Sequence, residues 1–231
     1  SYRKAAELRP DLADVHYILG NTLKELGRLD EAAASYRKAA ELRPDFAGVH
    51  SNLGAVHIEL GQPEDAVASY RRVLALKPDS AEVHYNLGAV LKSLGRFDEA
   101  VEAYRHALEI KPDFAEAHNN LGSILNELGQ FDEAVDHFRQ AVELKPGLAE
   151  TYYNLGVALK DIGQLDGALT SFRKALEIQP DYIEAQTSLL FTLNYTGHSP
   201  EYCLQEAHKY GRVVAKKATA PFSDWRCAVR P

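Results

Sequence analysis

The chain has 231 residues, a net charge of −7 and two cysteines. It contains no run of about 18 apolar residues, which excludes a membrane-spanning helix of the usual kind. Its acidic balance argues against a nucleic-acid partner, because proteins that bind nucleic acids need basic surfaces.

The two cysteines, Cys203 and Cys227, are 24 residues apart and form no metal-binding pattern. A reduced, cytoplasmic setting is the simplest account of them. The negative charge is concentrated in the first 182 residues, which carry −9, whereas the last 49 residues carry +2. We interpret most of these charges as solvated faces of exposed helices.

The N-terminal stretch, residues 1–12, reads as half of a repeat. Tyr2, Ala5 and Pro10 match the aromatic, alanine and proline positions of the second helix in the repeats that follow. The stretch has neither an initial methionine nor a signal-peptide pattern. We therefore expect the chain to be a segment of a longer protein, with an exposed half-repeat at its N-terminus.

Five tandem copies of a 34-residue unit follow, with no residue between one copy and the next. Their bounds are 13–46, 47–80, 81–114, 115–148 and 149–182. A fixed period of this length is typical of a stacked helical repeat, in which each unit buries its apolar face against its neighbours.

Each unit reads as two helices, shown here for residues 81–114. Val83, Leu87 and Leu91 fall at helical spacing, and Gly95 follows as a helix-ending glycine. A second amphipathic helix then runs to Pro112, which cannot continue the hydrogen-bond ladder.

Smaller features of the unit give further expectations. Asp79 with Glu82, and Asp113 with Glu116, are spaced to form capping boxes at the starts of first helices. Gly88 and Ala100 are small, which predicts a close crossing of the two helices. An aromatic residue in the second helix is expected to fill the gap toward the next hairpin; these residues are Tyr36, Tyr70, Tyr104, Phe138 and Phe172.

The pattern of Leu-Gly, Ala, Tyr/Phe, Ala and Pro at these offsets resembles the tetratricopeptide repeat (TPR). The resemblance extends from Ser1 to about Leu193. It implies an all-α solenoid of helical hairpins that forms a right-handed superhelix, closed by a C-terminal capping helix. The fold alone says little about function.

The pattern changes after residue 182. Residues 183–218 read as a partial repeat and a capping helix, in which Leu190 stands where the repeat has glycine. Ser199 and Pro200 predict a helix start. We expect this helix to turn an apolar stripe inward, made of Leu204, Ala207, Gly211, Val214 and Ala218. Residues 219–231 show no periodicity and are predicted to form an extended tail.

Histidines recur at one place in the repeat, at His16, His50, His84 and His118. Neighbouring copies should lie about 10 Å apart, whereas zinc ligands must converge at about 2 Å, so we predict structural histidines and no metal site. The sequence has no phosphate loop, nucleophile elbow or paired carboxylates. We therefore predict no catalytic residue, no cofactor and no enzymatic activity for this chain.

Asparagines recur at one place on the outward stripe of the first helix. Asparagine is a poor helix former, so its recurrence calls for a reason. An amide both donates and accepts hydrogen bonds, which suits the backbone of an extended peptide with any side chains. The alternatives are that these amides bridge adjacent first helices, or that they were retained when the repeat duplicated. The four positions are Asn52, Asn86, Asn120 and Asn154.

Other polar side chains are predicted on the same stripe, where they could hold the side chains of a peptide ligand. Ordinary solvent exposure is the alternative for each of them. Some TPR co-chaperones clamp a C-terminal carboxylate, but Glu82 and Asn86 occupy places where that clamp needs basic residues. The predicted residues are Tyr17, Asn21, Lys24, Tyr85, Lys92, Asn119, Asn126, Tyr153 and Lys160.

A second resemblance concerns the parent protein. The asparagines within a TPR stack are similar to the protein-recognition half of O-linked N-acetylglucosamine transferases. The segment LLFTLNYTGHSPEYCLQEAHKYG, Leu189–Gly211, resembles the part that joins the repeats to the catalytic region in bacterial proteins of that kind. The resemblance implies that the asparagines bind the backbone of protein substrates and that the catalytic lobes would follow Pro231. Ile18 and Ser188 interrupt the series at its ends.

The sequence is therefore consistent with two functions. The first is a module that binds extended peptide or protein segments, with no nucleic acid and no membrane as partner. The alternative is a structural scaffold or spacer that self-assembles through its exposed N-terminal half-repeat.

Overall fold

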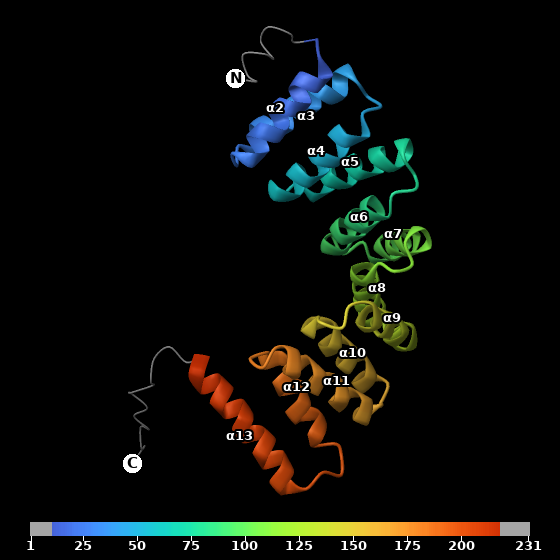
Figure 1. The fold of residues 1–231 in the computed structure, drawn as a ribbon. Coiled ribbons are helices and arrows are strands. Elements are labelled where there is room, and N and C mark those ends of the chain that lie inside the picture. Colours follow the sequence, from blue (N-terminus) through green and yellow to red (C-terminus); the bar gives the residue numbers. More distant parts are fainter. Residues whose placement is uncertain (1–10, 218–231) are drawn as a thin grey trace, which may run out of the picture. The chain divides into compact units, whose positions relative to one another are not determined.

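A computed structural model describes residues 11–217, and every regular element within this range is a helix (Figure 1). The chain divides into two compact units, residues 1–128 and residues 129–231. The first unit contains α2 (Ala13–Glu25), α3 (Leu29–Leu42), α4 (Ala47–Glu59), α5 (Pro63–Leu76), α6 (Ala81–Ser93), α7 (Phe97–Ile110) and α8 (Ala115–Glu127). The second contains α9 (Phe131–Leu144), α10 (Ala149–Asp161), α11 (Leu165–Ile178), α12 (Ile183–Leu193) and α13 (Pro200–Lys217).

The turn inside each hairpin depends on a glycine in the left-handed region of backbone space. Gly95 has a φ of +71°, and the N–H of Arg96 donates to the carbonyl of Leu91 at 2.9 Å. This satisfies a carbonyl that the end of α6 would otherwise leave without a partner. The helix-ending role expected of this glycine is confirmed. Pro63 lies in the first turn of α5, where its missing N–H costs little.

The starts of the first helices differ from expectation. Ser80 precedes α6 and Phe114 precedes α8, and neither helix start has a side-chain capping hydrogen bond. The predicted capping boxes were wrong, because Asp79 and Asp113 lie one residue too early to cap these helices.

The small residue of the first helix makes room for the aromatic residue of its own hairpin. A β-carbon placed on Gly88 would lie 2.9 Å from the ring of Tyr104, which is fully buried. The sequence predicted this ring in the gap toward the next hairpin; it packs against the first helix of its own hairpin. Gly88 therefore accommodates Tyr104, and not only the approach to Ala100 that the sequence suggested.

Hairpins stack through alternating contacts within each unit. In the first unit, α3 packs on α4, α5 on α6 and α7 on α8; in the second, α9 packs on α10 and α11 on α12. Charged side chains add a link between second helices, because Arg96 contacts Glu64 of α5 at 3.1 Å and Glu99 of α7 at 2.7 Å. The ion pair with Arg96 lowers the pKa of the Glu99 carboxyl.

The last helix contacts α12, but the apolar stripe predicted to pack inward is not buried there. Leu204 is 57% exposed and Ala207 and Gly211 are also exposed, whereas Glu206 is 7% exposed. Glu206 stands where the preceding repeats have their buried aromatic residue, and Lys209 pairs with it at 2.6 Å. The expected burial of the stripe was wrong at Leu204, Ala207 and Gly211. The partial repeat exchanges its residues here, because Leu190 replaces the small glycine and Glu206 replaces the ring.

Some expectations fall outside the described residues. Residues 1–10 of the predicted half-repeat and the tail from residue 219 lie outside the described residues, as do Ala218 and the side chain of Val214. Among the helices of residues 11–217, none is both long and apolar enough to cross a membrane.

Candidate functional site

The predicted binding residues lie on the first helices of the hairpins, and all thirteen are half-buried. In the first unit, α2 carries Tyr17, Asn21 and Lys24, α4 carries Asn52, α6 carries Tyr85, Asn86 and Lys92, and α8 carries Asn119, Asn120 and Asn126. In the second unit, α10 carries Tyr153, Asn154 and Lys160. Partial exposure leaves these side chains within reach of a ligand while neighbouring helices fix their positions.

A polar network joins α2, α3 and α4. Nδ2 of Asn52 donates to Oδ1 of Asn21 at 2.9 Å and to the hydroxyl oxygen of Tyr17 at 3.3 Å. The hydroxyl of Tyr36 donates to the same Oδ1 of Asn21 at 2.7 Å. Burial raises the pKa of Tyr36 to about 12, and the nearby amide of Asn52 offsets part of that rise. The network therefore holds a neutral tyrosine and fixes two amides.

An open hollow of about 380 Å³ lies over this network. It is lined by Asn21, Lys24, Glu25, Tyr36 and Asn52. Lys24 also reaches across to Glu59 of α4 at 3.4 Å. The hollow thus offers amide, ammonium and carboxylate groups at the junction of two repeats.

A similar but simpler arrangement joins α6 and α8. Nδ2 of Asn120 donates to the hydroxyl oxygen of Tyr85 at 3.2 Å, and the ammonium of Lys92 donates to Oγ of Ser123 at 2.9 Å. Burial raises the pKa of Tyr85, and the bond from Asn120 opposes that rise. The buried hydroxyl of Tyr104 has no hydrogen-bond partner within the described part of the chain.

Asn86 differs from Asn52 and Asn120. It lies between them in the series, on α6, and makes no hydrogen bond to any described residue. The hydrogen-bond partners of Asn52 and Asn120 include a tyrosine on the preceding first helix. At the corresponding position before Asn86 the chain has Ser51. Bridging between first helices therefore accounts for Asn52 and Asn120 but leaves the amide of Asn86 available. Asn126 is different again, because its Oδ1 is buried without a partner among the described residues.

The sequence analysis missed a second period of 68 residues, twice the repeat length. A tyrosine, a lysine and an aromatic residue recur at this spacing: Tyr17, Lys24 and Phe46; Tyr85, Lys92 and Phe114; Tyr153, Lys160 and Tyr182. In each set the two rings pack together, with centroids 4.8, 4.8 and 5.2 Å apart. Comparing alternate copies, instead of adjacent ones, would have shown this period.

The recurring histidines have a structural role. Nε2 of His84 donates to the carbonyl of Pro78 at 3.0 Å, and His50 with Pro44 and His118 with Pro112 repeat the contact at the same distance. Each ring thus holds the end of the preceding second helix. Across residues 11–217, no group of three or more His, Cys, Asp or Glu side chains is arranged to hold a metal ion.

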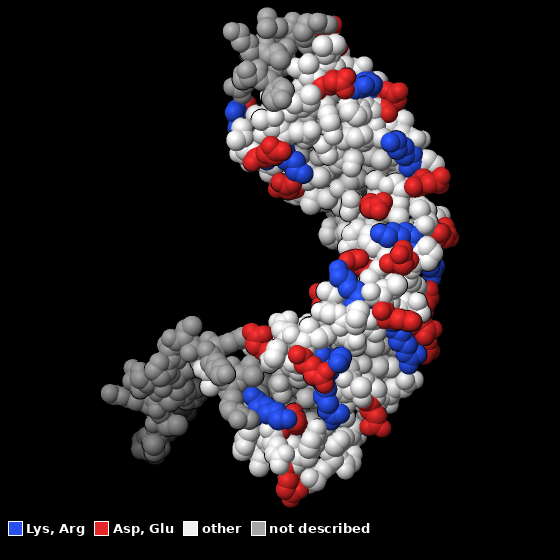
Figure 2. Space-filling view, in the orientation of Figure 1, with Lys and Arg blue, Asp and Glu red and all other residues white. Residues whose placement is uncertain are grey.

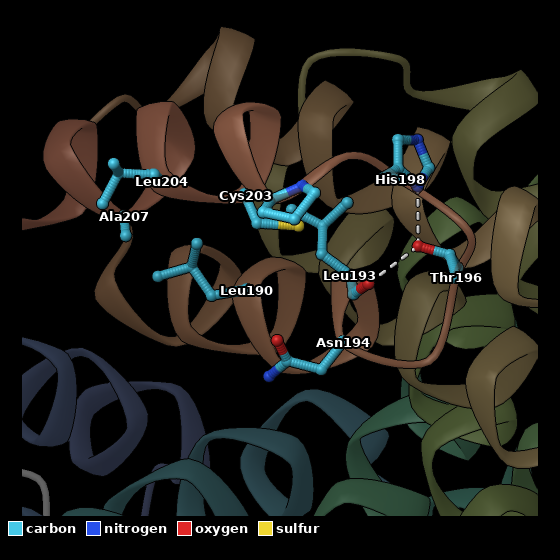
Figure 3. A pocket seen from close by; sticks show the side chains of 9 residues that line it. Leu190, Leu193, Asn194, Thr196, His198, Cys203, Leu204 and Ala207 are labelled. Carbon is cyan, nitrogen blue, oxygen red and sulfur yellow. Dashed lines mark hydrogen bonds between the residues drawn. The ribbon is translucent and has the colours of Figure 1, made fainter.

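The second unit has an apolar pocket of about 600 Å³ between α12 and α13 (Figure 3). Leu190 and Leu193 face Leu204 and Ala207 across it. At one end, Thr196 bonds to the carbonyl of Leu193 at 2.9 Å and to the ring of His198 at 2.7 Å. These bonds order the loop between the two helices.

Charges give no single-sign surface on the face seen in Figure 2. Lys and Arg side chains are interspersed there with Asp and Glu. This pattern differs from the basic stripe that nucleic-acid binding requires.

Comparisons with known proteins agree with this architecture. A family model described as tetratricopeptide repeat matches residues 45–113, 79–146 and 113–181, and one described as TPR repeat matches residues 20–61. None of the curated proteins matches the chain.

Several solved structures are similar. YrrB, described as a TPR protein with an unusual peptide-binding site, is 29% identical with a TM-score of 0.73, covering 81% of this chain and 97% of its own. A MamA protein is 27% identical with a TM-score of 0.70, covering 73% and 92%. Pseudomonas aeruginosa pilF covers 90% and 91% with a TM-score of 0.71 but only 18% identity, so it supports the fold alone.

Proposed function

The chain belongs to the tetratricopeptide repeat family, and we propose that it is a protein-interaction module that binds an extended peptide or protein segment along its first helices. The observation that carries this proposal is the amide of Asn86, which is half-buried and makes no hydrogen bond to a described residue. Asparagine disfavours the helix interior, so an unbonded amide there brings no stability of its own. A bound peptide would supply the hydrogen-bond partner of this amide.

The chemistry of the surrounding groups favours a peptide backbone. Amides bond to backbone N–H and C=O groups irrespective of the side chains that flank them. First helices about 10 Å apart would meet about every third residue of an extended chain, which rises about 3.3 Å per residue. The peptide-binding site described for YrrB, a structurally similar chain, is consistent with this class of ligand.

We further propose that the parent protein is an O-linked N-acetylglucosamine transferase-like protein in which this chain recognises the substrate. The support is the series Asn52, Asn86, Asn120 and Asn154, together with the segment Leu189–Gly211. In this proposal the chain binds substrate and performs no catalysis. A full-length protein that glycosylates a peptide only when the asparagines are intact would agree with it. Equal glycosylation by a full-length Asn86→Ala variant would refute it.

The binding proposal is tested with a peptide selected from a random-sequence library on the wild-type chain. The combined Asn86→Ala and Asn120→Ala substitutions should weaken binding about tenfold or more, since each hydrogen bond is worth about 0.5–1.5 kcal/mol. Gln140→Ala is the matched control, because it removes an exposed amide from the second helix α9. Equal affinity of all three proteins, or failure to select any peptide, would contradict the proposal.

A further inference from the structure

The tyrosines of alternate repeats are held firmly in place. The ring of Tyr17 packs on Phe46, and the guanidinium of Arg43 lies 4.0 Å from the centroid of the Phe46 ring. The second set repeats this arrangement, with Tyr85 on Phe114 and the ammonium of Lys111 at 4.7 Å. Stacking of this kind restricts the ring and therefore fixes where its hydroxyl lies.

The hydroxyl oxygen of each of these tyrosines accepts a hydrogen bond from the asparagine of the next repeat. The bonds are 3.3 Å from Asn52 to Tyr17 and 3.2 Å from Asn120 to Tyr85. The first helices α2 and α4 contact each other, as do α6 and α8. The tyrosine bonds therefore join neighbouring first helices, α2 to α4 and α6 to α8.

The repeat at residues 47–80 lacks the tyrosine and the aromatic residue that pack together in the repeats on either side of it. Ser51 stands in place of the tyrosine and Ser80 in place of the phenylalanine. Asn86, the asparagine that follows, makes no hydrogen bond to the described residues. The difference in bonding between Asn86 and its two neighbours therefore follows from the residues at 51 and 80.

We propose that Tyr17 and Tyr85 are positioning residues that divide the asparagines of the first unit into two kinds. Asn52 donates both N–H groups of Nδ2 to the protein, and Asn120 donates one, to Tyr85. Both present Oδ1 as an acceptor to a backbone N–H of the ligand. Asn86 makes no hydrogen bond to a described residue and can both donate to a ligand C=O and accept from an N–H. The ligand part of this inference rests on the proposed peptide-binding function, whereas the division into two kinds does not.

The bonds of Asn52 restrict which ligand residue can face it. Both N–H groups of Asn52 are already donated, to Tyr17 and to Asn21, so only its oxygen remains for a partner. A peptide residue opposite Asn52 must then supply an N–H, which proline lacks. The preferred ligand is an extended segment without proline at the residue that faces this asparagine.

The ligand-free protein provides the first test. The side-chain amide signals of Asn86 and Asn120 are assigned in the NMR spectrum of the labelled chain, and their temperature dependence is measured. Tyr85→Phe should move the Asn120 signals and leave those of Asn86 unchanged. Ser51→Tyr combined with Ser80→Phe should give Asn86 the smaller temperature dependence of a bonded amide. Asn86 and Asn120 signals that behave alike in the wild type and both variants would overturn the inference.

Binding provides the second test, with the peptide selected on the wild-type chain as the probe. Tyr85→Phe should weaken binding about threefold to tenfold through the loss of a preorganised side chain, under conditions in which the variant remains fully folded. Proline placed in turn at each peptide residue should abolish binding at the residue that faces Asn52. Asn52→Ala should relieve that sensitivity. If Asn86→Ala and Asn120→Ala weaken binding but Tyr85→Phe does not, the positioning role is wrong and the proposed function stands.

If no substitution on the first helices affects binding, the proposed function fails. The NMR comparison then still decides whether two kinds of asparagine exist. The two failures are therefore distinguishable.

Discussion

The hydroxyl of Tyr36 donates a hydrogen bond of 2.7 Å to Oδ1 of Asn21, which joins the two helices of the first complete hairpin. Two repeats later, Ala89 takes the place of Asn21, and the buried hydroxyl of Tyr104 has no partner among the described residues. The same buried ring is thus satisfied in one hairpin and unsatisfied in the other. Equivalent substitutions in the two hairpins should therefore have different effects on stability.

Removing the two hydroxyls should have different effects on stability. Tyr36→Phe should lower the free energy of unfolding by about 1 kcal/mol, because a buried hydrogen bond is lost. Tyr104→Phe should be neutral or stabilising, since it removes a buried polar group that has no partner. Phe138 and Phe172 already occupy this place in other repeats. Urea denaturation of the two variants measures the difference, and equal losses in both would contradict this account.

Supplying the missing acceptor should stabilise the third repeat. Ala89→Asn should raise the free energy of unfolding by about 1 kcal/mol, less the lower helix propensity of asparagine. The same substitution made with Tyr104→Phe should bring no gain. A double-mutant cycle over the two sites measures the coupling, and a coupling near zero would show that the two side chains do not bond.

The glycine that faces the aromatic ring should not tolerate a methyl group. Gly88→Ala places its β-carbon 2.9 Å from the Tyr104 ring, and overpacking of this kind costs about 1–3 kcal/mol. Gly147→Ala is the matched control, because nothing lies within 4 Å of its added β-carbon. Thermal unfolding should show a lower midpoint for the first variant only. A tolerated Gly88→Ala would mean that the ring moves aside at little cost.

Alkaline pH should destabilise the chain through its buried tyrosines. Burial raises the pKa of Tyr36 to about 12 in the folded chain, against an ordinary value near 10 in the unfolded one. The folded state therefore binds more protons in this window, and stability falls as pH rises from about 10 to 12. Urea midpoints measured at about pH 9 and about pH 11 should fall less for Tyr36→Phe than for the wild type. Identical decreases in the two proteins would argue against a raised pKa at this site.

The local architecture of the repeat could be predicted from sequence because it depends on neighbours close in the chain. Gly95 ends a helix through its own backbone conformation, and Pro63 begins one for a similar reason. Gly88 shows the limit of this approach. Its small size predicted close packing, but its partner, the ring of Tyr104, was recognised only from the structure.

The candidate site could be predicted in residue identity but not in bonding. The series of asparagines was visible in the sequence, yet the tyrosine partners of Asn52 and Asn120 lie on the preceding first helix, 35 residues away. Which amides are engaged depends on the geometry between repeats. The alternation of tyrosine with serine or asparagine, at positions 17, 51, 85 and 119, was an available signal of that geometry.

The last helix shows a different limit. Its apolar spacing predicted that Leu204 would face inward, but Leu204 is exposed and Glu206 is buried. Periodicity assumes that the apolar side of a helix meets an apolar neighbour. Here the apolar neighbours Leu190 and Leu193 are present, but a pocket separates them from Leu204 and Ala207, so the stripe is not buried.

The most direct test of peptide binding along the first helices is an NMR titration of the labelled chain with its selected peptide. The account predicts that the side-chain amide signals of Asn52, Asn86 and Asn120 shift on binding. The largest change is expected at Asn86, whose amide has no hydrogen bond to a described residue in the free chain. The signal of Gln140 on α9 should stay in place. Shifts confined to the second helices, with the three asparagine signals unmoved at saturation, would contradict the central claim.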